Sequence, residues 1–149
     1  MRAVIQRVLQ ASVEVDGNSI ASINKGLAVL AGFAPSDTSK DLEYICQKII
    51  GIRIFDDASS FMNLSLSDVH GGLLLIPQFT LYGDARKGRR PSFSSAMKPE
   101  TASEYFDSFV AICKAAYPHV ATGKFKAHMK VMLVNDGPVT ILLDSSKLF

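Results

Sequence analysis

The sequence of 149 residues contains only two cysteines, Cys46 and Cys113, and they lie far apart in the chain. Two cysteines are too few for a disulfide framework. Each falls on the apolar stripe of a predicted helix, so we expect both in the core. The longest apolar runs, such as Leu73–Ile76, are too short to span a bilayer. The N-terminus alternates and carries charges, which is typical of a strand and not of a signal peptide, so a cytoplasmic location is expected.

Motifs of several catalytic classes are also missing. There is no Gly-rich phosphate loop, no His-Glu-x-x-His pair and no Cys-x-x-Cys. The three histidines, His70, His119 and His128, are far apart and are not spaced with carboxylates as metal ligands would be. Asp56-Asp57, in a Ser-rich stretch, is typical of a turn. The sequence therefore argues against a metal enzyme or a nucleotide hydrolase.

The overall composition is that of a globular protein. Apolar residues make up 48% and charged residues 20%, and the length fits one domain over residues 1–149. No repeat, low-complexity linker or shift in composition marks a second domain. The net charge of +2 is nearly neutral, so a nucleic-acid partner would have to meet a local basic patch.

Alternating and continuous apolar patterns predict a series of strands, most of them in the first quarter of the chain. A buried strand, apolar on both faces, is predicted later, and irregular stretches follow the first helix and this strand. The predicted strands are Ala3–Val8, Ser12–Val15, Ser19–Ile23, Gly26–Phe33 and Leu73–Leu81; the irregular stretches are Ile52–Val69 and Tyr82–Lys98.

Two helices and a final hairpin complete the predicted elements. Apolar residues at helical spacing predict helices over Ser39–Ile50 and from Pro99 to Tyr117-Pro118. Near the end of the chain, Asp136-Gly137 lies between two apolar runs and predicts a hairpin turn. Pro138 removes a backbone donor and would stiffen that turn. The order predicts an α/β fold with a mixed, largely antiparallel, barrel-like sheet and two covering helices.

Two polar side chains interrupt the buried strand, within "LLLIPQFTLYGD". Gln78 and Thr80 are two residues apart, so in a strand they would share a face and point away from Phe79. They could pair across strands or face solvent. Alternatively, they could form the lip of a pocket in which amides and a hydroxyl meet a carbonyl group.

Basic residues gather in two places. One is the predicted loop after the buried strand, which contains a single acid, Asp84. The other is "GKFKAHMKVML", where basic residues alternate with Phe125, Ala127 and Met129 and would form a row on one strand face. Such runs are often solvated surface, but two of them favour a phosphate-rich partner. The residues are Arg86, Lys87, Arg89, Arg90 and Lys98 in the loop, and Lys124, Lys126, His128 and Lys130 in the row.

Several motifs in order resemble the D-aminoacyl-tRNA deacylases. The most specific are "PQFTL" at Pro77–Leu81 and "NDGPVT" at Asn135–Thr140. Further matches over nearly the whole chain are "IQRV" near the start, "GIRIFDD" at Gly51–Asp57, "MN" at Met62-Asn63 and "RPSF" at Arg90–Phe93. The resemblance implies a homodimer that hydrolyses the ester between a D-amino acid and the 3′-terminal ribose of tRNA, and that also removes glycine from tRNA-Ala. It implies no metal or cofactor.

The resemblance also implies how L-amino acids are excluded. The bond between Gly137 and Pro138 would be cis, and the pair would enter the pocket of the partner subunit. Arg7 would help to hold this Gly-Pro tip. A filter made of backbone need not depend on the substrate's side chain, since glycine lets the main chain come close and a proline bond resists rotation.

The pocket implied by the resemblance is built around the "PQFTL" motif. Pro77, Gln78 and Phe79 would line it, the last two through their backbone N–H groups, and Met129 would form part of its wall. Thr80 is a candidate nucleophile, although no base is placed beside it by sequence. The basic loop and row would hold the 3′ end and acceptor stem of the aminoacyl-tRNA.

Two residues depart from the pattern of the family. Pro77 stands where most members have serine, and Lys126 where a small residue, usually glycine, is found. A related animal branch that removes L-alanine from tRNA also carries proline at the first position, but it lacks the phenylalanine kept here as Phe79. That branch is one alternative function. A non-catalytic nucleic-acid-binding protein is another.

Overall fold

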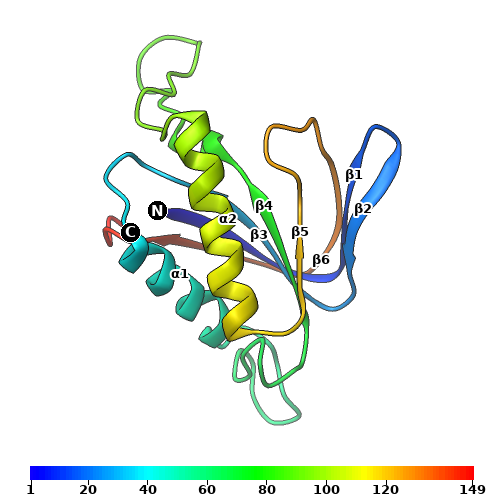
Figure 1. The fold of residues 1–149 in the computed structure, drawn as a ribbon. Coiled ribbons are helices and arrows are strands. Elements are labelled where there is room, and N and C mark those ends of the chain that lie inside the picture. Colours follow the sequence, from blue (N-terminus) through cyan, green and yellow to red (C-terminus); the bar gives the residue numbers. More distant parts are fainter.

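A computed structural model describes residues 1–149, which form one curved sheet with two long helices packed beside it (Figure 1). The 3₁₀ helix η1 spans Phe79–Tyr82. The remaining elements are β1 (Arg2–Val15), β2 (Asn18–Ile23), β3 (Gly26–Gly32), α1 (Ser39–Gly51), β4 (Gly72–Pro77), α2 (Pro99–Ala116), β5 (Val120–Thr122) and β6 (Lys130–Asp144).

The sheet is mixed, and its long central strand is β1. The strand order is β2-β1-β3-β4-β5, and β6 pairs with β1 alone. Strand β1 is antiparallel to β2, β3 and β6, whereas β3–β4 and β4–β5 are parallel. The sheet curls into a barrel-like shape, and α1 and α2 cover one face (Figure 1). The predicted fold class is therefore confirmed.

Both helices lie where the sequence predicts them. The Thr38 backbone N–H donates to Asp41 Oδ2 at 2.8 Å, which satisfies one of the free donors at the start of α1. Helix α2 begins at Pro99, where the missing N–H is no loss. Cys46 and Cys113 are buried on the inner faces of the two helices. Neither helix is long and apolar enough to cross a membrane.

The core lies on both sides of β4, which is why this strand is apolar throughout. Leu73 and Leu75 belong to a cluster of 23 buried residues beneath the two helices. Leu74 and Ile76 belong to a second cluster of seven, on the opposite face of the sheet. A parallel strand buried on both faces reads as a continuous apolar run.

Two strand boundaries differ from the sequence prediction. The strands predicted at Ala3–Val8 and Ser12–Val15 are one strand, because β6 pairs with β1 across the gap with shifts in register near Val8. Strand β4 ends at Pro77 and not at Leu81. Pro77 cannot donate to the ladder, and after Gln78 the chain turns into η1. The prediction that Gln78 and Thr80 share a strand face is therefore wrong.

The predicted hairpin at Asp136-Gly137 is also wrong. Strand β6 continues through these residues and stays beside β1 (Figure 1). Gln6 pairs with Thr140 and Val8 with Asn135, so residues 136–139 form a wide bulge opposite a single residue of β1. The Asp-Gly turn sequence forms this bulge and not a hairpin. The reason is that β1 is long enough to pair with β6 on both sides of it.

The predicted basic row is wrong as well. Residues 124–129 form an irregular turn between β5 and β6, and only Lys130 lies in a strand. Lys126 has a positive φ of 59°, which breaks the two-residue alternation of a strand. The lysines therefore do not share one strand face.

Candidate active site

The Gly-Pro bulge of β6 is held from behind by the buried side chain of Arg7. Arg7 Nε donates to the Asp136 carbonyl oxygen at 3.1 Å, and Nη1 donates to the Ile54 carbonyl oxygen at 2.6 Å. The Gly137–Pro138 peptide bond is cis, and both residues are exposed. The bulge thus presents its backbone to the outside while its base is fixed by charge-assisted hydrogen bonds.

Gly137 is required at its position for two reasons. Its φ of +124° lies in a region that L side chains rarely adopt. A methyl group there would lie 2.8 Å from Val139 Cγ2, 3.0 Å from the Val139 nitrogen and 3.2 Å from Arg7 Nη2. Any larger residue must therefore displace Arg7 or the bulge itself.

The "PQFTL" segment forms a second site at the end of β4. A methyl group at Gly123 would lie 2.8 Å from Met129 Sδ and 3.5 Å from Pro77 Cδ, so Pro77 and Met129 both lie beside Gly123. The Gln78 backbone N–H donates to the Ala31 carbonyl oxygen at 2.7 Å. It is therefore occupied, and the prediction that it faces a substrate is wrong for this conformation. The Phe79 N–H has no partner in the protein.

Thr80 has no base beside it. Its Oγ1 accepts a hydrogen bond from Gln78 Nε2, and no histidine or carboxylate contacts it. A hydroxyl needs an adjacent base to act as a nucleophile at neutral pH. The geometry therefore provides no means of activating Thr80.

The two parts of the predicted site are far apart within one chain. Arg7, opposite the bulge, pairs with Leu27 of β3, which pairs with Leu73 of β4; Pro77 lies four residues further along β4. Three strand spacings and four residues separate them, which is about 19 Å along the sheet. Along the sheet, the bulge is therefore well separated from the Pro77 segment of its own chain.

The basic loop is closed at its base by a short antiparallel bridge. The Asp84 N–H donates to the Ser92 carbonyl oxygen at 2.7 Å, and the reverse bond is 2.8 Å. Arg86 pairs with Asp84 at 2.7 Å, which lowers the pKa of that carboxyl group. Of the cations between the two bridge residues, Lys87, Arg89 and Arg90 make no ion pair and are exposed.

The lysines of the predicted row are partly neutralised. Lys126 Nζ lies 3.4 Å from Glu100 Oε1, and Lys130 Nζ lies 3.0 Å from Glu14 Oε1. Exposed pairs of this kind contribute little to stability. They nevertheless reduce the positive charge that these lysines offer to a phosphate.

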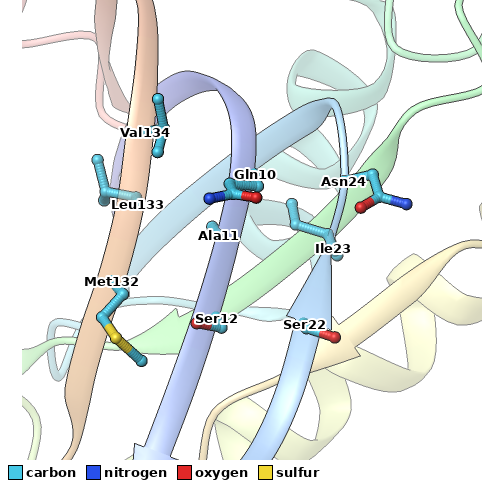
Figure 2. Close-up of a pocket in the computed structure, with 9 residues that line it drawn as sticks. All are labelled: Gln10, Ala11, Ser12, Ser22, Ile23, Asn24, Met132, Leu133 and Val134. Carbon is cyan, nitrogen blue, oxygen red and sulfur yellow. The ribbon is translucent and has the colours of Figure 1, made fainter.

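An open cavity of about 340 Å³ lies on the outer face of β1, β2 and β6 (Figure 2). Gln10, Ser12, Ser22 and Asn24 are its polar residues, and none of them titrates near neutral pH. Its apolar lining includes Met132, Leu133 and Val134 of β6, as Figure 2 shows. The cavity has no pair of acid and base, so we do not regard it as a catalytic site.

Sequence reasoning missed two features around these sites. One is that Ile54 and Asp56 hold the Arg7 side chain in place, the second through a contact of 3.4 Å between Arg7 Nη1 and Asp56 Oδ1. The other is an exposed aromatic pair, in which the rings of Phe79 and Phe93 meet edge to face at 5.1 Å. Asp56 belongs to the "GIRIFDD" motif and Phe93 to the "RPSF" motif, but no periodicity indicates that these two segments reach the sites.

Comparisons with known proteins show the family to which the chain belongs. The family model described as D-Tyr-tRNA(Tyr) deacylase matches residues 4–144. A protein of Thermosipho africanus named D-aminoacyl-tRNA deacylase is 55% identical over the whole of both chains, and one of Clostridioides difficile with the same name is 56% identical. The chain belongs to this family of tRNA deacylases, which are hydrolases.

Two solved structures share the fold. The first, titled c-Myc DNA Unwinding Element Binding Protein, is 41% identical with a TM-score of 0.93, and the match covers 97% of this chain and 98% of the other. The second is titled as a probable eukaryotic D-amino acid tRNA deacylase. It is 17% identical with a TM-score of 0.84, over 95% and 97% of the two chains. This second likeness concerns the fold alone.

Proposed function

We propose that this chain, acting as a single domain over residues 1–149, hydrolyses D-aminoacyl-tRNA to the free D-amino acid and tRNA. The full-length identity of 55% to a D-aminoacyl-tRNA deacylase carries this proposal. The two motifs that resemble the family most closely, "PQFTL" and "NDGPVT", form the two exposed sites described above. We extend the activity to glycine mischarged on tRNA-Ala, and we place the protein in the cytoplasm with its substrate.

Hydrolysis here would depend on positioning and not on a nucleophilic side chain. The aminoacyl ester is already activated, so water can attack it if the developing oxyanion is stabilised. The unpartnered N–H of Phe79 is the candidate donor for that oxyanion. The 2′-hydroxyl of the tRNA would assist the attack. Thr80 would help to shape the pocket without forming a covalent bond.

Rejection of L-amino acids is assigned to the exposed backbone of Gly137 and Pro138. Because this pair lies about 19 Å from Pro77 of its own chain along the sheet, it would have to act in the pocket of a second copy. Each pocket of a homodimer would then be completed by its partner. The rigid support from Arg7 fits a filter that must hold its backbone still.

The outer face of β6 is suited to such a dimer. Strand β6 has one neighbour in the sheet, so its other edge is unpaired. Met132 and Val134 are 51% and 43% exposed, and Leu9 of β1 is 52% exposed. A long edge strand with exposed apolar side chains is typical of a surface that another chain covers.

The basic loop is the proposed contact for the acceptor stem of tRNA. Lys87, Arg89 and Arg90 are exposed without acidic partners, and phosphate contacts of this kind contribute affinity without reading sequence. Lys124, Lys126 and Lys130 are secondary candidates. Two of those three already pair with glutamates.

One assay separates this function from its alternatives. The purified protein is incubated with tRNA charged with D-tyrosine, L-tyrosine, glycine or L-alanine, and release of each amino acid is measured. We expect loss of D-tyrosine and glycine while L-tyrosine is spared. Release of L-alanine alone would indicate the L-alanine-removing branch, which Pro77 favours. RNA binding without any release would indicate a non-catalytic binding protein.

A further inference from the structure

Two exposed aromatic rings at the foot of the basic loop, those of Phe79 and Phe93, have no role in the proposed chemistry, which uses only the backbone of Phe79. Phe79 and Phe93 are 55% and 40% exposed, and their rings meet at 5.1 Å with an angle of 67° between planes. Edge-to-face pairs hold each other in a defined orientation. Large apolar side chains that remain exposed in a fixed orientation are typical of a surface that receives a ligand.

The position of Phe93 is fixed by the backbone around it. Residue 93 directly follows the Asp84–Ser92 bridge, so the loop cannot swing the ring away without opening two backbone hydrogen bonds. A methyl group at Gly83 would lie 3.0 Å from Phe93 Cε1. The ring therefore packs on bare backbone at one place, meets Phe79 at another, and remains partly open to solvent.

The surroundings of the pair indicate the chemistry of its ligand. On one side is the unpartnered backbone N–H of Phe79, the proposed oxyanion donor. Beyond the Asp84–Ser92 bridge, in the loop next to Phe93 in the chain, are the free cations Lys87, Arg89 and Arg90. A ligand that contacts both the Phe79 N–H and the loop cations would have an ester at one end and phosphates at the other. Aromatic platforms beside cationic loops bind single-stranded nucleic acid by stacking on its bases.

We propose that Phe93, held by Phe79, is a stacking platform for a base of the single-stranded 3′ end of tRNA. This inference rests on the proposed function, since it takes that RNA as the ligand. Phe93 would act as a positioning residue. It would hold the last nucleotides so that the ester arrives at Phe79, while the loop cations hold the phosphates behind them.

The test uses uncharged RNA, so that no hydrolysis is needed. Binding of the full-length protein is measured with a stem that carries a CCA tail and with the same stem carrying an abasic tail. We expect the wild type to prefer the CCA tail by about tenfold, the scale of one base stacked on an aromatic ring. Phe93→Ala should abolish this preference and leave binding of the abasic tail unchanged.

Two further variants separate stacking from packing. Phe93→Leu keeps apolar contact with Gly83 but offers no ring, so it should bind like Phe93→Ala, whereas Phe93→Trp should keep the preference. Phe61→Ala, which removes a phenylalanine that is 88% exposed on another loop, is the matched control and should have no effect. Wild-type behaviour of Phe93→Leu, or equal weakening of both tails in Phe93→Ala, would overturn the platform.

The outcome is distinguishable from failure of the proposed function. If the wild type releases no amino acid from any charged tRNA but still prefers the CCA tail through Phe93, the hydrolytic function fails and the platform stands. If charged tRNA is hydrolysed and the wild type binds both tails equally, the platform alone is wrong.

Discussion

Arg7 lies directly behind the bulge of β6, and its Nε donates to the carbonyl oxygen of Asp136 at 3.1 Å. The same guanidinium donates to the Ile54 carbonyl oxygen, so it joins three segments of the chain that are far apart in sequence. Its planar fork of donors is suited to this task, whereas a lysine would offer a single point charge. The bulge and its support therefore act as one unit.

Arg7→Lys should loosen this unit. Loss of hydrogen bonds made by a charged, buried donor should lower the free energy of unfolding by about 1.5–3 kcal/mol, and release of D-tyrosine from tRNA should fall. Arg53→Lys is the matched control, because Arg53 also donates to a carbonyl oxygen, that of Asn63, but at the surface. Chemical denaturation and the deacylation assay check both variants. An Arg7→Lys enzyme with normal stability and activity would contradict the assigned support.

Gly137→Ala should disable the bulge. The added methyl would clash with Val139 and Arg7, and the φ of +124° adds backbone strain of about 1–3 kcal/mol. Displacement of the tip by about 1 Å should reduce the rate about a hundredfold for every charged tRNA. The control is Gly17→Ala, which has a φ of +80° and nothing within 4 Å of the new methyl. It should lose stability alone, and an equal loss of activity in both variants would argue against a specific role.

Thr80→Val should keep most of the activity, because Thr80 has no base to activate it. We expect rates within about tenfold of wild type, far from the roughly thousandfold loss typical of a catalytic group. The measurement is single-turnover hydrolysis of D-tyrosyl-tRNA. A thousandfold loss in a folded variant would establish Thr80 as the catalyst.

Neutralising Lys87, Arg89 and Arg90 together should raise KM for charged tRNA. The slope of log K against log salt should become shallower by about 2–3 if each cation contacts one phosphate. The rate at saturation should change little, since these contacts are equally strong in the ground and transition states. Lys126 and Lys130, which pair with glutamates, form the control set. If the slope changes only in the control set, we would infer that the RNA contacts the turn before β6 and not the basic loop.

The loop after α1 should open in acid. Asn63 Nδ2 and the backbone N–H groups of Ser59 and Ser60 donate to Asp57, which lowers the pKa of that carboxyl group to about 2. Because the pKa is lower in the folded state, the stabilisation is complete above about pH 4 and is lost as pH falls towards 2. The amide shifts of Ser59 and Ser60, followed by NMR, should report this. They should stay constant over the same range in Asp57→Asn, and a wild-type titration near pH 4 would refute the assignment.

The helices and the buried strand could be predicted because their signals are local. Apolar spacing, Pro99 at a helix start and the unbroken run at Leu73–Ile76 depend on near neighbours in sequence. The course of β6 could not be predicted in this way. Asp136-Gly137 is a good turn sequence, and only the length of β1, set by residues more than a hundred positions away, keeps the strand straight.

The candidate site likewise has a part that the sequence predicts and a part that it does not. Pro77, Met129 and Gly137 are recognisable from motifs, and the structure shows their surroundings. The hydrogen bond from the Gln78 N–H to the Ala31 carbonyl oxygen and the turn at Lys126 depend on tertiary structure, which the motifs do not indicate. Strand periodicity was the wrong assumption at both positions, since β4 ends at Pro77, and Lys126 lies between the end of β5 at Thr122 and the start of β6 at Lys130.

The register of β6 after the bulge is fixed for a reason unrelated to the substrate. After it, Val139 is buried and Ile141 and Leu143 pack against the core, whereas Thr140 and Leu142 face outwards. Because side chains alternate with a period of two, one inserted or deleted residue would turn the inward set to the outside. One residue inserted or deleted in the paired part of β6 after the bulge would therefore cost core packing, whereas a substitution of an outward residue there would not. The hydrophobic core, and not the ligand, determines which side chains of β6 after the bulge point inwards.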